Sequence, residues 1–167
     1  MDASAPPRAI HAIGVGGFLV GLLDGADAVV FSYVAQGVAP ETLFQYIASG
    51  LLGRESFNGG WRTAALGVAC HFAIAFSAAA VYYAASLVWS ALYRKPWICG
   101  PIYGIAVYLF MQHVVLPLSA VARRHVAHLV TANLLFSDIF FVGLPIALTA
   151  RHSARQRVVA GSPTVEI

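Results

Sequence analysis

The chain has 167 residues, of which 59% are hydrophobic and 10% are charged, and ten Lys and Arg against seven Asp and Glu give a formal charge of +3. Soluble domains have about a quarter of their residues charged, so this composition, with a mean hydropathy of +0.76, excludes an ordinary soluble domain and indicates a membrane protein. The basic residues are scattered rather than gathered into a basic face, which gives no support to nucleic-acid binding.

Four long apolar runs predict four transmembrane helices, because each span needs roughly 20 apolar residues. The runs cover residues 9–37, 64–93, 97–122 and 126–150. Short basic links join the last three runs, so we expect neighbouring spans to run in opposite directions. The predicted fold is an all-α membrane protein in which one domain, residues 1–150, forms an antiparallel four-helix bundle. Residues 151–167 are expected to be a disordered cytoplasmic tail.

The first run places two carboxylates, Asp24 and Asp27, where lipid would lie. The same run carries Gly17, Gly21 and Gly25 in a GxxxGxxxG ridge, and small residues of this kind let another helix approach closely. We therefore expect this face, with Asp24 at its edge, to point into the protein. Intramembrane acids mark functional sites, which predicts proton or cation binding, although a structural hydrogen-bonded pair fits the same residues.

The first run also has two features of a cleaved signal peptide, a basic residue before it and the A-x-A pattern of residues 26–28. The apolar pattern resumes directly afterwards, which favours a span. The connection that follows predicts a short helix over residues 40–52, because Pro40 suits a first helical position and Gly53 a helix end. Its apolar side predicts that this helix lies at the membrane interface.

Further polar residues fall at a similar depth in the other spans. Gly67 and His71 share a close-packing face of the second run, and a rise of about 1.5 Å per residue from the span centres places His71, His113 and Asn133 in the same half of the membrane as Asp27. The predicted proton- or cation-binding residues are Asp24, Asp27, His71, His113 and Asp138, with Tyr82, Gln112 and Asn133 as supporting polar groups.

The distribution of Lys and Arg predicts the orientation of the chain. Six lie on the side of the termini and four on the other side, namely Arg8, Arg94, Lys95, Arg151, Arg155 and Arg157 against Arg54, Arg62, Arg123 and Arg124. The positive-inside rule then places both termini in the cytoplasm.

The segments HFAIAFSAAAVYYAASLV, GPIYGIAVYLFMQHVVLPLS and NLLFSDIFFVGLPIAL occur in this order in the chain. In that order the chain resembles the YagU-like family of uncharacterised bacterial inner-membrane proteins, over residues 64–150. The resemblance implies a small helical protein of the bacterial inner membrane and no established activity. The positions that would match recurring residues of the family are His71, Tyr82-Tyr83, His113, Pro117-Leu118 and Asn133, whereas Ser137 and Asp138 stand where the family implies a further His.

Three classes of function fit these residues. The first is proton- or cation-linked transport or permeation through the Asp and His residues. The second is a non-catalytic accessory or assembly subunit, whose glycine faces dock a larger membrane complex or further copies of the chain. The third is an electron carrier with His71 and His113 as axial ligands of a haem.

Other chemistry has weaker support in the sequence. A metal site built from His71, His113 and Asp27 is chemically reasonable but has no spacing signature. The chain has no GxSxG or GxxxxGK[ST] motif, so an enzyme is not favoured. The lipid bilayer is the expected partner in every case.

Overall fold

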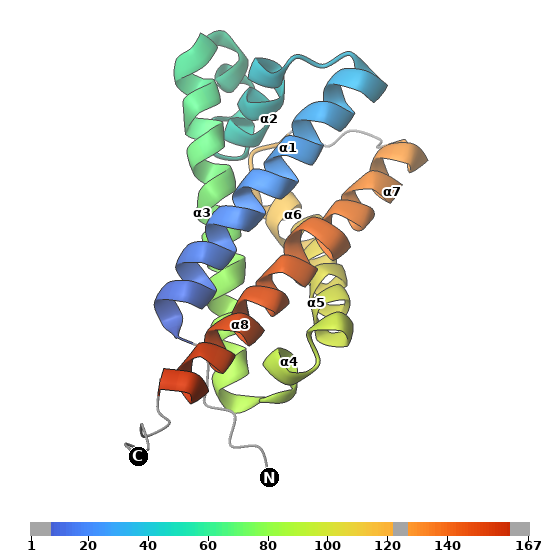
Figure 1. Cartoon of the computed structure of the whole chain (residues 1–167). Coiled ribbons are helices and arrows are strands. Elements are labelled where there is room, and N and C mark those ends of the chain that lie inside the picture. The colour runs from blue at the N-terminus through green and yellow to red at the C-terminus, as the bar shows by residue number, and fades with distance from the viewer. Residues whose placement is uncertain (1–7, 122–126, 161–167) are drawn as a thin grey trace, which may run out of the picture.

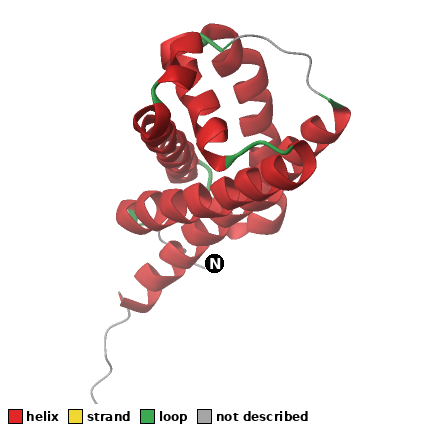
Figure 2. Cartoon of the chain, turned by 90° about the horizontal axis from the view of Figure 1, so that it is seen from above, coloured by secondary structure: helices red, strands yellow, loops and turns green. Residues whose placement is uncertain are grey.

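The computed structural model describes residues 8–121 and 127–160. In these residues the chain is almost entirely helical and has no strand, as Figure 2 shows. The helical segments are η1 (Ile10–Val15), α1 (Gly16–Gln36), α2 (Pro40–Leu52), η2 (Gly53–Asn58), α3 (Gly60–Val88), α4 (Ala91–Arg94), α5 (Pro96–Phe110), η3 (Met111–Val115), α6 (Leu116–Leu118), α7 (His128–Ser137), η4 (Asp138–Gly143) and α8 (Leu144–Ala160).

Four continuous helices within the described residues are long and apolar enough to cross a membrane, as the sequence predicted. They are Ile10–Gln36, Gly60–Val88, Pro96–Leu118 and His128–Arg155. The chain reverses direction from each of these helices to the next (Figure 1). The first and last of them meet where Ser153 Oγ accepts a hydrogen bond from the Arg8 N–H and donates one to the Arg8 carbonyl. The beginning of the first long helix and the end of the last one therefore lie at the same end of the molecule.

Several helix ends differ from the sequence prediction. The second long helix begins at Gly60 and ends at Val88, because the chain turns at Trp89 and Ser90. The last one continues to Ala160, so residues 151–160 are helical and do not belong to a disordered tail. The two hydrogen bonds between the Ser153 hydroxyl and the Arg8 backbone hold this extension against the start of the first helix. Residues 122–126 and 161–167, which include Arg123 and Arg124 of the orientation count, lie outside the described residues.

The short helix α2 occupies the predicted residues, Pro40–Leu52. Pro40 is at its first turn, and Gly53 ends it with a φ of 60°, a conformation that favours glycine. A Cβ added to Gly67 of α3 would overlap the carbonyl oxygen of Phe44, so the backbones of α2 and α3 are in close contact. The helix α2 caps the end of the molecule opposite Arg8 and Ser153 (Figure 1).

Three stretches of the long helices have π-helical turns: Ile10–Val15, Met111–Val115 and Asp138–Gly143. The last two end two residues before the prolines at positions 117 and 145. Proline has no N–H and its ring crowds the preceding turn, and a wider π turn relieves both problems. The last long helix passes Pro145 and continues to Ala160. The third long helix ends at Leu118, one residue after Pro117.

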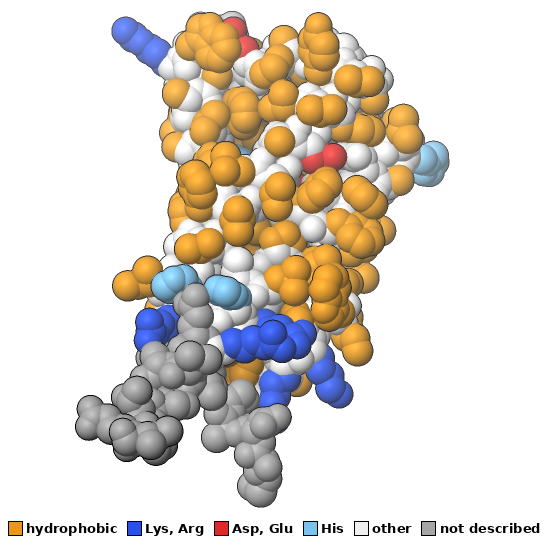
Figure 3. All heavy atoms as spheres, in the orientation of Figure 1, with side chains coloured by type: hydrophobic (Ala, Val, Ile, Leu, Met, Phe, Trp, Pro, Cys, Tyr) orange, Lys and Arg blue, Asp and Glu red, His pale blue; other side chains and the backbone are white. Residues whose placement is uncertain are grey.

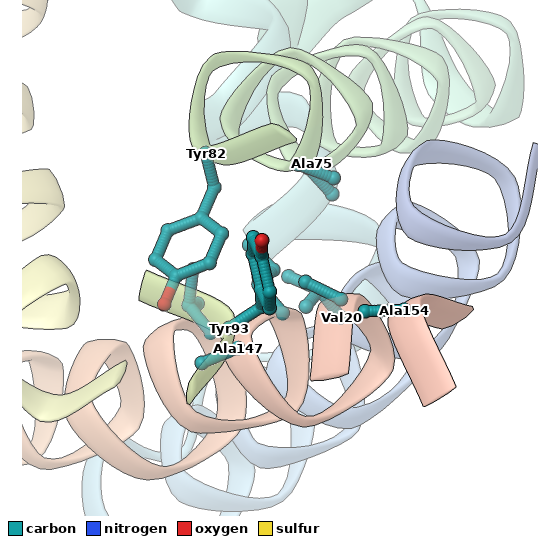
Figure 4. Packing of buried hydrophobic residues seen from close by; sticks show 10 residues of the cluster. Val20, Ala75, Tyr82, Tyr93, Ala147 and Ala154 are labelled. Atoms are coloured by element: carbon teal, nitrogen blue, oxygen red, sulfur yellow. The ribbon is translucent and has the colours of Figure 1, made fainter. Parts of the chain in front are cut away.

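The core is built mainly from alanines, with two tyrosines among them. Tyr82 is 1% exposed and packs with Tyr93 between α3, α4 and α8 (Figure 4). The alanines of this cluster are Ala75, Ala79, Ala147, Ala150 and Ala154. Small side chains allow close packing of helices, which is the main source of contact energy where lipid removes the hydrophobic drive between spans.

The outer surface is apolar, and tryptophans mark its two ends. Large apolar side chains cover the face seen in Figure 3, with Lys and Arg gathered at the lower end. Trp61 and Trp89, at opposite ends of α3, are 72% and 65% exposed. At 1.5 Å per residue they are about 42 Å apart along the helix, close to the roughly 40–45 Å of a bilayer with its headgroups. This spacing suits two membrane interfaces.

Candidate functional site

The glycine ridge of α1 lies against aromatic rings of α3. A Cβ added to Gly21 would overlap the ring of Phe72, and one added to Gly25 would lie 3.1 Å from His71 Nε2. A Cβ added to Gly17 would overlap the ring of Phe76 and would also lie 2.9 Å from the Cα of that residue. Since glycine has no side chain, these rings rest directly on the α1 backbone. The ridge thus brings His71 to the level of the two carboxylates of α1.

The contact between His71 and α1 defines its tautomer. His71 Nε2 is 2.9 Å from the carbonyl oxygen of Gly21. A carbonyl oxygen only accepts hydrogen bonds, so Nε2 carries a hydrogen and Nδ1 is the nitrogen that can take up or release a proton. The neighbouring Phe72 ring lies edge-on to the imidazole, with 5.8 Å between centroids, and restricts its orientation.

The two carboxylates of α1 are joined to the last long helix. Asp24 Oδ1 accepts a hydrogen bond of 2.6 Å from Ser137 Oγ, and Asp27 Oδ2 accepts one of 3.0 Å from Asn133 Nδ2. Residues three or four positions apart share one face of a helix, so the two hydrogen bonds lie one turn apart between α1 and α7. We call Asp24, Asp27, His71, Asn133, Ser137 and Asp138 the mid-span network.

Asp24 is the centre of the mid-span network. Its carboxyl group lies within electrostatic range of His71, Asp27 and Asp138, so these four ionisable groups are neighbours. Asp138 directly follows Ser137 and begins the π-helical turns of η4. The network therefore collects ionisable groups from three of the four long helices, and the second oxygen of each α1 carboxylate remains outside the two hydrogen bonds.

The prediction of a buried Asp/His cluster was wrong about burial. Asp24, Asp27, His71 and Asp138 are all half-buried, and among the described residues no charged side chain is fully buried. Of the mid-span network only Ser137, which is 3% exposed, is fully buried. Figure 3 shows an acidic patch at mid-height in an apolar surface. No further helix of residues 8–121 and 127–160 covers this face, and the network is therefore partly open to its surroundings.

His113, which the sequence placed in the same cavity, lies elsewhere. Its side chain is exposed, and Nδ1 is 3.0 Å from the carbonyl oxygen of Leu109 in its own helix. The opposite face of α5 is occupied, because Gly100 and Gly104 pack against the backbone of η4 and α8. His113 therefore faces away from the last long helix, and no described contact links it to His71.

The different surroundings of His71 and His113 bear on the predictions of a metal site and of a haem. Within residues 8–121 and 127–160, no group of three or more His, Cys, Asp or Glu is arranged to hold a metal ion. The metal site predicted from His71, His113 and Asp27 stays a prediction. A haem between His71 and His113 stays a prediction, and the different neighbours of the two imidazoles lend it no support.

The remaining predicted residues have separate roles in the structure. The Tyr82 hydroxyl donates a 2.7 Å hydrogen bond to the Leu92 carbonyl, so this side chain holds α4 in place and lies outside the mid-span network. Gln112 is half-buried in the same π-helical turns as His113. Sequence reasoning did not assign Ser137 to the site. Its position four residues after Asn133, on the same helix face, was the available signal.

Four helices able to span a membrane, with ionisable groups meeting at mid-span, are typical of a multi-pass helical membrane protein. Comparison with protein-family models, with curated proteins and with solved structures found no match to this chain. The YagU-like resemblance therefore stays a prediction based on the segments quoted above.

Proposed function

We propose that the protein conducts or transports protons or small cations across a membrane through the mid-span network. The observation that carries this proposal is the meeting of Asp24, Asp27, Asp138 and His71 from three long helices at one level. Ionisable side chains are costly inside a membrane, and where they meet across helices they commonly form ion pathways or proton relays. An apolar contact would pack these helices without that cost.

The hydrogen-bond geometry favours protons among these ions. His71 Nδ1 and the second oxygen of Asp24 lie outside these hydrogen bonds, and Ser137, which donates its hydroxyl hydrogen to Asp24, can still accept a hydrogen bond from a neighbouring water. Water that enters the half-open face beside Asp27 would complete a chain of hydrogen bonds, because one bridging water replaces a direct bond at little cost. A proton taken up at Asp27 would then pass by way of Asp24 to His71.

The proposed membrane placement extends the sequence prediction. The four long helices form an antiparallel bundle across a bacterial inner membrane, with both termini cytoplasmic and α2 at the opposite interface. The six-to-four distribution of Lys and Arg and the exposed Trp61 and Trp89 support this arrangement, and the YagU-like resemblance supports the choice of membrane.

A second candidate function follows from the half-exposure of the network. A carboxylate that faces lipid near the bilayer centre costs about 2.5–3.5 kcal/mol or more, so water or another protein must cover Asp24 and Asp27. If a partner covers them, the chain is an accessory or assembly subunit of a larger membrane complex, or one copy in a homo-oligomer. In that case the polar side chains of the mid-span network would only hydrogen-bond one another and would carry no ions.

Flux measurements distinguish the two candidates. The purified full chain is reconstituted into liposomes that contain a pH-sensitive dye, and a potassium diffusion potential is imposed, with Na⁺ and K⁺ flux measured in parallel. Under the transport proposal the wild-type protein gives flux above protein-free vesicles, and Asp24→Asn removes it while the protein still inserts. Glu55→Gln is the matched control, because Glu55 pairs with Asn58 outside the long helices.

Two results would overturn the transport proposal. One is a wild-type protein that inserts correctly and gives no flux of protons, Na⁺ or K⁺. The other is an Asp24→Asn variant with full flux, since an amide keeps the hydrogen bond from Ser137 but does not exchange protons. Either result, together with a stable complex in mild detergent, would favour the accessory subunit.

A further inference from the structure

We propose that the end of the molecule near Arg8 and Ser153 binds the phosphate headgroups of anionic phospholipids. The residues that would bind them are Arg8, Lys95, Arg151 and Arg155, and we call these four residues the basic end. They come from three separate segments: the start of the first long helix, the link between α4 and α5, and the last turns of α8. This proposal is independent of the mid-span network and stands whether or not the protein conducts ions.

The backbone of the basic end is held in place by buried contacts. The Tyr82 hydroxyl bonds the carbonyl of Leu92 within α4, and Tyr93 is buried against alanines of α8, such as Ala147 (Figure 4). Ser153 binds the backbone of Arg8 through two hydrogen bonds. Packing thus fixes the backbone of the three segments that carry the basic residues. Binding of an anion would therefore not incur the entropy cost of ordering these segments.

The charge at this end is not balanced by described carboxylates. The acidic residues of the described chain are at the mid-span level or near α2, at the opposite end: Asp24, Asp27, Glu41, Glu55 and Asp138. Figure 3 shows Lys and Arg gathered at the lower end of the molecule. Arg151 and Arg155 are four residues apart, so they extend from one side of α8. Like charges at this spacing on a helix repel one another, and a shared phosphate would relieve the repulsion between Arg151 and Arg155.

Two tryptophans place the basic end at the depth of lipid headgroups. Trp89 and Trp97 flank α4, and each is 65% exposed. Exposed tryptophans of membrane proteins concentrate where acyl chains meet headgroups, and Lys95 lies two residues before Trp97. Arginine binds a phosphate through two parallel N–H groups. An anionic headgroup is favoured over a zwitterionic one, because the cation of a zwitterionic headgroup neutralises its own phosphate. Basic pockets between helices at this depth are typical binding sites for anionic lipids.

The test measures lipid binding to the purified full chain in mild detergent by native mass spectrometry, with phosphatidylglycerol and phosphatidylcholine of equal chain length. We expect the wild-type protein to retain phosphatidylglycerol preferentially, and a Lys95→Gln, Arg151→Gln, Arg155→Gln triple variant to lose about a hundredfold in affinity. This figure corresponds to roughly fivefold, or about 1 kcal/mol, for each basic residue near the headgroups. An Arg54→Gln, Arg62→Gln variant is the control, because both residues lie near the opposite end.

Three results would overturn the proposal: equal retention of the two lipids, equal loss of lipid in the triple and the control variants, or displacement of the lipid by low millimolar inorganic phosphate. The last result would assign the basic end to a soluble anion. If the triple variant fails to fold, the single variant Lys95→Gln replaces it in the test, with an expected loss of about fivefold in affinity for phosphatidylglycerol. Lys95 is exposed and lies in a link between helices, so its replacement leaves the core intact.

Discussion

Two of the glycine-lined helix contacts in this protein differ in what most of the glycines meet. Between α1 and α3, Gly21 and Gly25 face side-chain rings, and Gly17 meets both the ring and the Cα of Phe76. Between α5 and the last long helix, glycine backbones meet other backbone atoms directly. There a Cβ on Gly104 would overlap the Asp138 carbonyl, and one on Gly143 would overlap the carbonyl of Gly100.

This difference shows that a GxxxG pattern alone does not define the kind of contact. A ring can rotate about its side-chain bonds, whereas a helix backbone shifts only if the whole helix moves. The contact of α1 with α3 is therefore the adaptable one, and it also carries His71 and adjoins Asp24. The contact of α5 with η4 fixes the position of Asp138 through the backbone of that residue. Substitutions at the two contacts measure how far they differ.

The largest expected effect is that of Gly104→Ala. The added methyl group would overlap the Asp138 carbonyl and lie 2.7 Å from the Cα of Ile139, so α5 and the last long helix must separate. Overpacking of this kind costs about 1–3 kcal/mol, and backbone contact on both sides places this variant at the upper end. Thermal unfolding in detergent, followed by tryptophan fluorescence, measures the loss.

Gly14→Ala is the matched control for this variant, because nothing lies within 4 Å of the position that its Cβ would take. Alanine is the better helix former by roughly 1 kcal/mol, so this variant should be as stable as the wild type or slightly more so. Equal stability of the Gly104→Ala and Gly14→Ala variants would show that the contact between α5 and η4 is not tight.

The next largest effect is expected at the α1–α3 contact. In Gly21→Ala the methyl group meets the outer atoms of the Phe72 ring, which can swing aside. We expect a loss of about 1–2 kcal/mol, smaller than that for Gly104→Ala. Phe72→Leu in the same chain should restore part of the stability, because it removes the atoms that clash. No restoration in the double variant would mean that the α1 backbone, rather than the ring, resists the methyl group.

A smaller effect is expected from removing one hydrogen bond of the mid-span network. Ser137→Ala deletes the donor to Asp24, and Asn133→Ala deletes the donor to Asp27. Hydrogen bonds between membrane helices contribute about 0.6 kcal/mol on average and at most about 1.7 kcal/mol. Ser137→Ala should lie nearer the larger value, since Ser137 is buried. Unfolding in SDS measures both variants, and losses well above this range would indicate that the network holds the fold together.

The sequence predicted the helices better than their ends. The bounds of α2 followed from local signals, the proline at position 40 and the glycine at position 53. The end of α3 did not, because residues 89–93 carry no charge, Pro or Gly that would signal a helix end, and the apolar run continues past the turn. Tyr93 is an example, since it lies in the core although the helix ends at Val88.

Helical periodicity in the sequence predicted the part of the candidate site that lies on the first long helix. The glycine ridge predicted that Asp24 faces into the protein, and in the structure Asp24 accepts a hydrogen bond from Ser137 and has His71 as an electrostatic neighbour. Depth alone misplaced His113, because depth along a helix says nothing about which way a side chain points. Ser137 was missed because hydroxyl side chains in membrane helices usually bond their own helix, as Ser77 does to the carbonyl of Ala73.

The smallest expected effect, that of His113→Gln, tests this assignment of the two histidines. His113 is exposed and pairs within its own helix, so glutamine should change the stability by no more than about 0.5 kcal/mol, as is usual for surface positions. Proton flux should also be unchanged in His113→Gln.

His71→Gln is the matched change, because glutamine keeps an N–H donor for the Gly21 carbonyl but has no group that titrates. Under the transport proposal it should abolish proton flux and leave insertion intact. The opposite pattern, with flux lost in His113→Gln and kept in His71→Gln, would move the pathway to the outer face of α5, where only a second copy or a partner protein could complete it.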